Sequence, residues 1–119
     1  MLLKLVYIAG PYRAKTEAEV CENIAAARSA AIRIWRTGAV AVCPHLNTAF
    51  MGGVIPDNEF LRGDLELMAR CDAVFAMPGH ESSKGAANEV RVAKEQEMPV
   101  FTEFGRLSSW IREVSHPAR

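Results

Sequence analysis

Short apolar runs alternate with amphipathic segments along the chain, and this alternation constrains the fold more than any other feature. Four runs have the length and composition of buried strands, over 2–9, 39–43, 73–77 and 100–103. The segments over 16–36, 57–70, 84–96 and 107–114 have the pattern of helices. Strands that are apolar on both faces and separated by helices are typical of parallel sheets. We therefore predict an α/β protein with an open parallel sheet of about four strands in the order 2-1-3-4, with helices on both faces.

The ends of these segments carry recognisable local signals. Thr16, followed by Glu17 and Glu19, predicts the start of the first helix, and Gly38 predicts its end. Asp57 is expected to cap the second helix, whose inward residues would be Phe60, Leu61, Leu65 and Met68. Residues 44–56 read as a long irregular loop, and such loops in compact domains are usually functional or disordered.

Composition excludes several classes of protein. The 119 residues are enough for one domain, spanning 1–119, and 14 basic residues balance 14 acidic ones. This balance does not favour a nucleic-acid polymer as partner, and no apolar run has the roughly 20 residues of a membrane span. Without the layout of a signal peptide at its start, the sequence is expected to be cytoplasmic. The three widely spaced cysteines are expected to be buried, reduced thiols, namely Cys21, Cys43 and Cys71.

Polar residues follow the strands at the edge where ligands bind in such folds. The order 2-1-3-4 reverses between strands one and three, and the crevice of an open parallel sheet lies at the carboxyl ends of such strands. Residues 10–13 and 78–83 occupy those ends, and His45 and Asn47 belong to the loop that opens onto the same edge. Glu89 is the only acid in the window 82–91 and lies at the border of the packed face of its helix. This convergence of separate clusters predicts a functional site.

Three stretches of the chain resemble one family. The segments YIAGPYR, GDLELMARCDAVF and SSKGAANE look like those of the nucleoside 2-deoxyribosyltransferase-like superfamily, over residues 3–104. That superfamily includes the transferases and the 2'-deoxynucleoside 5'-phosphate N-hydrolases. The resemblance implies a flavodoxin-like, Rossmann-like fold and an enzyme that cleaves N-glycosidic bonds.

The resemblance also implies roles for particular residues. Glu89 matches the nucleophile, Asp64 matches a second acid eight residues before Asp72, and Tyr7 matches the tyrosine of strand one. In the hydrolases, a Gly-x-x-Arg turn and a serine six residues before the nucleophile hold the 5'-phosphate. Gly10, Arg13 and Ser83 fall on those positions. From their places at the predicted crevice, His45, Asn47 and Gly85 are also expected to bind substrate.

Three features of the comparison with this family bear on the substrate and the reaction type. The transferases have an aspartate at the position of Ser83, so Ser83 favours a nucleotide over a nucleoside. Residues 107–119 differ from the fifth strand and tail of the transferases, which favours hydrolysis over base exchange. The 44–56 loop departs from the hydrolase pattern, so no base preference carries over. Hydrolysis and base exchange both remain open.

The side chains themselves, apart from the resemblance, suit the cleavage of an N-glycosidic bond. Cleavage of an N-glycosidic bond develops positive charge at the anomeric carbon, which the Glu89 carboxylate can attack or stabilise. A second acid with a raised pKa, assigned to Asp64, would protonate the leaving base. Arg13 offers a planar donor fork to a phosphate. No cofactor or metal is required, and the expected ligand is a small nucleotide or nucleoside.

Each assignment has a structural alternative. Tyr7 could be only a buried aromatic, Asp64 and Arg13 solvated charges, His45 and Asn47 loop hydrogen-bonding residues, Gly85 a packing glycine, and Glu89 an ordinary helix acid. His80 and Glu81 are expected to be exposed loop residues, and Asp72 to cap the loop entering strand three.

Alternatives also exist for the protein as a whole. A non-catalytic nucleotide sensor of the same fold would bind without releasing base. A metal hydrolase would use His45, Asp64, Asp72 and His80, but their spacing matches no familiar metal site. The Ala-rich first helix and Trp35 offer a surface for a homodimer or larger homo-oligomer.

Overall fold

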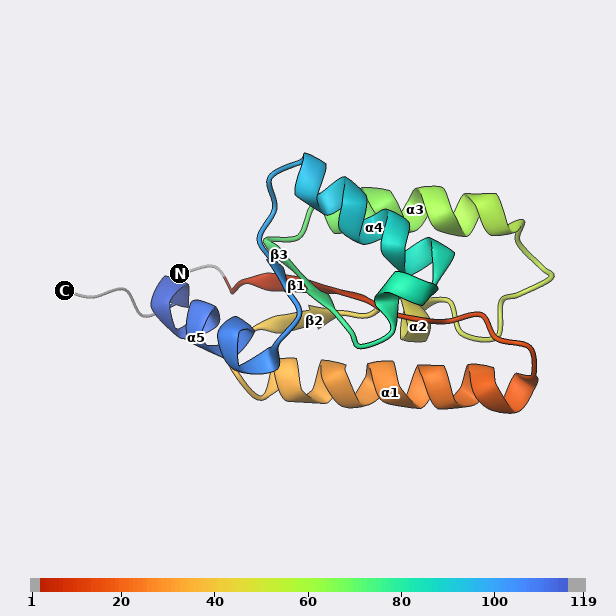
Figure 1. The fold of residues 1–119 in the computed structure, drawn as a ribbon, viewed down its shortest axis with the longest axis horizontal. Helices are drawn as coiled ribbons and strands as arrows, with labels where there is room; N and C mark the ends of the chain where they lie inside the picture. Colours follow the sequence, from red (N-terminus) through yellow and green to blue (C-terminus); the bar gives the residue numbers. More distant parts are fainter. Residues whose placement is uncertain (1–2, 116–119) are drawn as a thin grey trace.

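A computed structural model describes residues 3–115 and shows a parallel sheet between two layers of helices (Figure 1). The strands are β1 (Leu5–Ala9), β2 (Val40–Val42), β3 (Ala73–Ala76) and β4 (Val100–Phe101). Their order is β2-β1-β3-β4 and every pairing is parallel. The predicted sheet and its order are confirmed. Because the order reverses between β1 and β3, the carboxyl ends of these two strands form the expected crevice position.

The helices divide between the two faces of the sheet. Helices α1 (Glu17–Trp35) and α5 (Phe104–Ser115) lie on one face, and α3 (Asp57–Ala69) and α4 (Lys84–Glu95) lie on the other (Figure 1). A short helix α2 (Pro44–Asn47) follows β2, and a 3₁₀ turn η1 (His80–Ser82) follows β3. The predicted arrangement of helices on both faces is confirmed. Helices α1, α3 and α4 all begin at the end of the molecule where β1 and β3 finish (Figure 1).

The face covered by α1 and α5 is a continuous apolar core. Val6 and Ile8 of β1 contact this side, together with Phe75 of β3 and apolar residues of both helices. In a strand, successive side chains point to opposite faces, so the intervening Tyr7 lies on the other side. There it belongs to a second cluster with Met68 of α3 and Val90 of α4, in which it is fully buried.

The local signals at helix ends were read correctly in two places. Thr16 caps α1, since its side chain accepts a hydrogen bond from the Glu19 N–H at 3.1 Å. Gly38 has φ 93° and its N–H donates to the Trp35 carbonyl, which ends the helix as expected. Ser83 caps α4 in the same way, accepting from the Ala86 N–H at 3.4 Å.

Several expectations were wrong. Asp57 is the first residue of α3 rather than its cap, which is Pro56. Leu61 is 50% exposed and not inward. Of the three cysteines expected to be buried thiols, all are free, but Cys21 is exposed and Cys71 is only half-buried. The 44–56 segment is less irregular than expected, because Pro44 begins α2. The last helix begins at residue 104, not 107.

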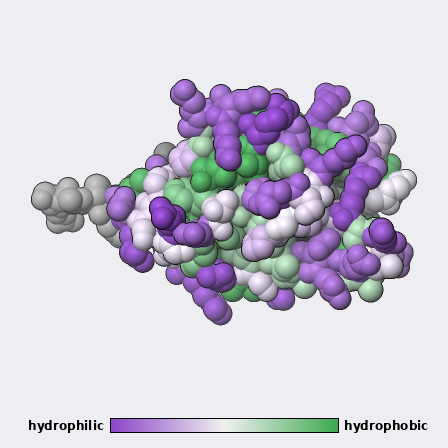
Figure 2. Space-filling view, viewed as in Figure 1, coloured by the Kyte–Doolittle hydropathy of each residue, from purple (hydrophilic) through white to green (hydrophobic). Residues whose placement is uncertain are grey.

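The surface is mixed in character. From the side shown in Figure 1, charged and polar side chains dominate the outer rim, and apolar side chains show between them at the level of the sheet (Figure 2). None of the helices in residues 3–115 is long and apolar enough to span a bilayer.

Candidate active site

A tyrosine of the sheet and a glutamate of the covering helix form the centre of the site. The Tyr7 hydroxyl donates a hydrogen bond to Oε2 of Glu89. Tyr7 points from β1 into the α3/α4 layer because it alternates with Val6 and Ile8, which face α1 and α5. Glu89 lies on α4 one residue before the buried Val90, which places it at the border of the packed face as expected.

Burial makes both groups reluctant to ionise. Loss of hydration raises the pKa of Glu89 to about 7, and the nearby negative charge of Asp64 adds to this, while the hydrogen bond from Tyr7 opposes it. The pKa of Tyr7 is raised well beyond its ordinary range, mainly by burial and then by the Glu89 charge. Tyr7 therefore keeps its proton near neutral pH and remains a hydrogen-bond donor to Glu89.

Asp64 of α3 is the second acid of the site. Its pKa is raised to about 6 by burial. Its charge acts on both Tyr7 and Glu89, so the predicted pair of acids lies within electrostatic reach across the α3–α4 interface. Because the pKa of Asp64 is the lower of the two, Asp64 is more ionised than Glu89 between about pH 6 and 7. This arrangement can provide one carboxylate and one carboxylic acid at the same time.

The turns after β1 and β3 pack directly on each other. A Cβ at Gly10 would lie 2.5 Å from the Met77 sulfur, so a larger residue there would have to displace the Met77 side chain. Gly79 has φ 86°, and a side chain there would touch Pro11. The two predicted loop clusters are therefore held side by side at the crevice.

His45 anchors the β1 turn to the segment after β2. It is 5% exposed, and its Nε2 lies 2.9 Å from the carbonyl oxygen of Pro11. Burial lowers the pKa of His45, so the imidazole is neutral and donates its Nε2–H to this carbonyl. Its ring also packs against Tyr12. These contacts favour the structural alternative, in which His45 positions the turn, over direct contact with a ligand.

Arg13 and Ser83 have protein partners of their own. Nη2 of Arg13 lies 2.6 Å from Oδ2 of Asp57, and both side chains are largely exposed. Ser83 is occupied as the cap of α4. Sequence analysis did not identify Asp57 as the partner of Arg13. Asp57 precedes a segment with helical periodicity, and this position favoured the role of a helix cap. No local signal could have paired residues separated by 43 others.

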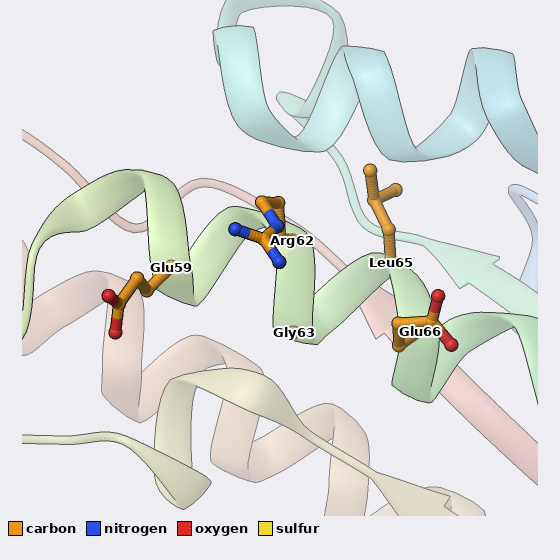
Figure 3. Close-up of a pocket in the computed structure, with 5 residues that line it drawn as sticks. All are labelled: Glu59, Arg62, Gly63, Leu65 and Glu66. Carbon is orange, nitrogen blue, oxygen red and sulfur yellow. The ribbon is translucent and has the colours of Figure 1, made fainter.

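Asn47 and Asp64 line one hollow. It has a volume of about 330 Å³, and Thr48 and Phe60 also border it. A larger hollow of about 540 Å³ lies along α3 over Gly63, and Leu65 points from this helix towards α4 (Figure 3). Neither hollow is lined by Tyr7 or Glu89. The buried acid and tyrosine, and not hollow size, therefore define the site.

Gly85 lies in the first turn of α4. An added side chain there would make only an ordinary contact, 3.9 Å from Leu61. The space around Gly85 therefore does not explain why a glycine stands there.

The residues of the metal alternative occupy different places. Asp72 accepts a hydrogen bond from the Leu5 N–H at the amino end of β3. His80 is buried, contrary to expectation, and its Nδ1 lies 2.8 Å from the Met77 carbonyl oxygen. Within residues 3–115, no three or more His, Cys, Asp or Glu side chains gather as metal ligands would.

Comparison with known proteins places the chain in a family. A family model described as "Domain of unknown function (DUF7768)" matches residues 4–103. The chain belongs to the DUF7768 family. No curated protein matches its sequence.

One solved structure shows the same fold as this DUF7768 chain. It is a 2-deoxyribosyltransferase from the psychrotolerant bacterium Bacillus psychrosaccharolyticus, with a TM-score of 0.62 and 17% sequence identity. The alignment covers 83% of this chain and 74% of that enzyme. The expected α/β fold of the 2-deoxyribosyltransferases is thus confirmed for this member of the DUF7768 family.

Proposed function

We propose that this protein cleaves the N-glycosidic bond of a nucleoside 5'-monophosphate or nucleoside, with Glu89 as nucleophile. The observation that carries the proposal is the buried Tyr7–Glu89 pair with Asp64 beside it. The pKa of Glu89, about 7, is higher than that of Asp64, about 6, so in the free protein the proton lies preferentially on Glu89, and the proposed reaction requires it to pass to Asp64 when the substrate binds. The 2-deoxyribosyltransferase fold, and the sequence resemblance at the same three residues, support this reaction class.

The reaction divides into two balanced steps. A carboxylate oxygen of Glu89 forms a bond to the anomeric carbon as the bond from that carbon to the base breaks, and Asp64 gives its proton to the leaving base. Water then attacks the anomeric carbon, Asp64 accepts a proton from that water, and Glu89 leaves as a carboxylate. Tyr7 orients Glu89 through its hydrogen bond and stabilises the ionised carboxylate. A second base in place of water would give exchange instead of hydrolysis.

The remaining residues have proposed roles around the sugar and phosphate. Arg13 and the turn at Gly10 would hold the 5'-phosphate with Ser83 and the backbone N–H groups at the start of α4. Gly85 would admit the sugar beside α4. Asn47, which shares a hollow with Asp64, would contact the base. His45 would act by fixing the turn, because its ring is already bonded to that turn.

The proposal is tested by looking for free base. The protein is incubated with a panel of ribo- and deoxyribonucleoside 5'-monophosphates and the matching nucleosides, and the mixtures are separated by chromatography. We expect release of base from at least one member, with a monophosphate preferred. Saturable binding without any release would reject the enzyme and favour a nucleotide sensor.

Assembly through α1 is a separate proposal. Trp35 and Ile32 are 54% and 37% exposed on this helix, on the opposite side of the sheet from Glu89. Pairing two copies through these residues would bury an apolar surface and form a homodimer. Light scattering should give twice the monomer mass, and Trp35→Ser should give a monomer. A monomeric wild-type protein at micromolar concentration would reject the dimer.

A further inference from the structure

One ion pair joins the turn after β1 to the start of α3. Nη2 of Arg13 lies 2.6 Å from Oδ2 of Asp57, and the two side chains are 68% and 58% exposed. Arg13 follows the strand that carries Tyr7, and Asp57 is the first residue of the helix that carries Asp64. The pair therefore bridges the two elements that supply these residues of the candidate site.

We propose that Asp57 is a specificity-determining residue, which neutralises Arg13 in the free protein and is displaced from it by the substrate's phosphate. This inference rests on the proposed function in one respect, the binding of a 5'-phosphate by Arg13. It adds that phosphate binding is an exchange of one anion for another. Asp57 thereby sets how strongly the site prefers a phosphorylated ligand.

The geometry makes this exchange inexpensive. An exposed ion pair is weak because water screens both charges and two flexible side chains must be held in one arrangement. A phosphate offers Arg13 more than one oxygen and more charge than a carboxylate, so the guanidinium can form a stronger, forked contact. After release, Asp57 remains in the first turn of α3, where the helix dipole favours an anion.

The segment over residues 45–57 is also attached to the turn after β1 at its other end, and more firmly there. The buried His45 donates to the Pro11 carbonyl, and this hydrogen bond is partly buried. Residues 45–57 are thus attached to the turn twice, once through the partly buried hydrogen bond of His45 and once through an exposed ion pair. Only the exposed attachment can be exchanged without disturbing the packed turn, which identifies Asp57 as the displaceable group.

The test uses sugars without a base, because the preferred base is not defined. 2-Deoxyribose 5-phosphate and 2-deoxyribose are titrated into the protein at fixed ionic strength, with dissociation constants measured from NMR shift changes. Asp57→Asn should bind the sugar phosphate about twofold to fivefold more tightly, the value expected for release of a surface ion pair, and the free sugar unchanged. Glu17→Gln is the matched control: it removes an exposed acid from the first turn of α1, and it should change neither constant.

A double-mutant cycle with Arg13→Ala then tests the mechanism. If Asp57 acts by competing for Arg13, the Asp57→Asn gain should fall below about twofold in the Arg13→Ala background. An equal gain in both backgrounds would overturn the inference, as would no gain in wild type or no saturable binding of the sugar phosphate.

These results are separable from those that bear on catalysis. Release of base by a protein whose Asp57→Asn variant shows no gain would leave the proposed function standing and reject the role of Asp57. If Asp57→Asn binds the sugar phosphate selectively more tightly but the protein releases no base, the role of Asp57 stands and the proposed function is rejected.

Discussion

The two faces of the sheet differ in what they bury, although the same strands build both. The α1/α5 face contains Val6 and Ile8 of β1 and the fully buried Leu107 of α5. Tyr7 stands between those two residues in sequence but lies on the α3/α4 face, where the acids Glu89 and Asp64 act on it. One face gains stability from apolar burial, whereas the other retains groups whose charged forms burial disfavours. This division is consistent with a scaffold on one side and chemistry on the other.

The largest expected effect concerns the apolar face. Leu107→Ala removes a fully buried side chain and leaves a cavity, so the free energy of unfolding should fall by about 2–5 kcal/mol. Urea denaturation measures this change. The comparison would fail if Leu107→Ala lowered stability by less than about 1 kcal/mol, since this face would then not be the stabilising one.

On the α3/α4 face, we expect the Glu89→Gln substitution to raise stability at neutral pH, in contrast to Leu107→Ala. Below about pH 4.5, Glu89 is protonated in both folded and unfolded chains, and Glu89→Gln should change stability little. As the pH rises, the unfolded chain ionises first, because the folded pKa of Glu89 is raised to about 7. The wild-type protein therefore loses stability between about pH 4.5 and 7, and Glu89→Gln avoids this loss.

At pH 8 the Glu89→Gln variant should be more stable than wild type by about 1–3 kcal/mol. Its amide oxygen can still accept the Tyr7 hydrogen bond. Thermal denaturation at pH 4.5 and pH 8 measures the difference. A variant less stable than wild type at pH 8 would show that Glu89 stabilises the fold in its charged form.

The smallest effect concerns the balance of forces on Glu89. The Tyr7 hydrogen bond lowers the pKa of Glu89 and the Asp64 charge raises it. Tyr7→Phe should therefore raise this pKa above about 7, by a few tenths to one unit, whereas Asp64→Asn should lower it. Carboxyl ¹³C NMR titration reports both shifts. Shifts of the same sign in the two variants would contradict the electrostatic account.

The fold was largely predictable because its signals are local. Apolar runs predicted the strands, and Thr16 and Gly38 marked the ends of α1 correctly. The exposure of Cys21 was also readable: Ala27, Ala31 and Ile34 define the buried stripe of α1, and Cys21 lies off it. Cys21 was expected to be buried because it has an apolar neighbour in the sequence, whereas its position in the helical repeat places it on the exposed side.

The site was only partly predictable because its contacts are long-range. Glu89 was named from its place on its helix and from resemblance, and Tyr7 and Asp64 were named from resemblance. The structure brings the three within electrostatic reach of one another. The bond of His45 to Pro11 and the pair of Arg13 with Asp57 depend on how two loops meet in space. No pattern within a short window of sequence specifies such contacts. Their roles in binding and catalysis stay predictions.

The most direct test of the account compares base release by wild type and Glu89→Gln on the best substrate of the nucleotide panel. We predict that turnover falls by at least about a hundredfold, while the dissociation constant and the folded structure stay close to those of wild type, because the lost interaction belongs to the transition state. Near-wild-type turnover in Glu89→Gln would contradict the claim that the buried acid of the α3/α4 face carries the chemistry.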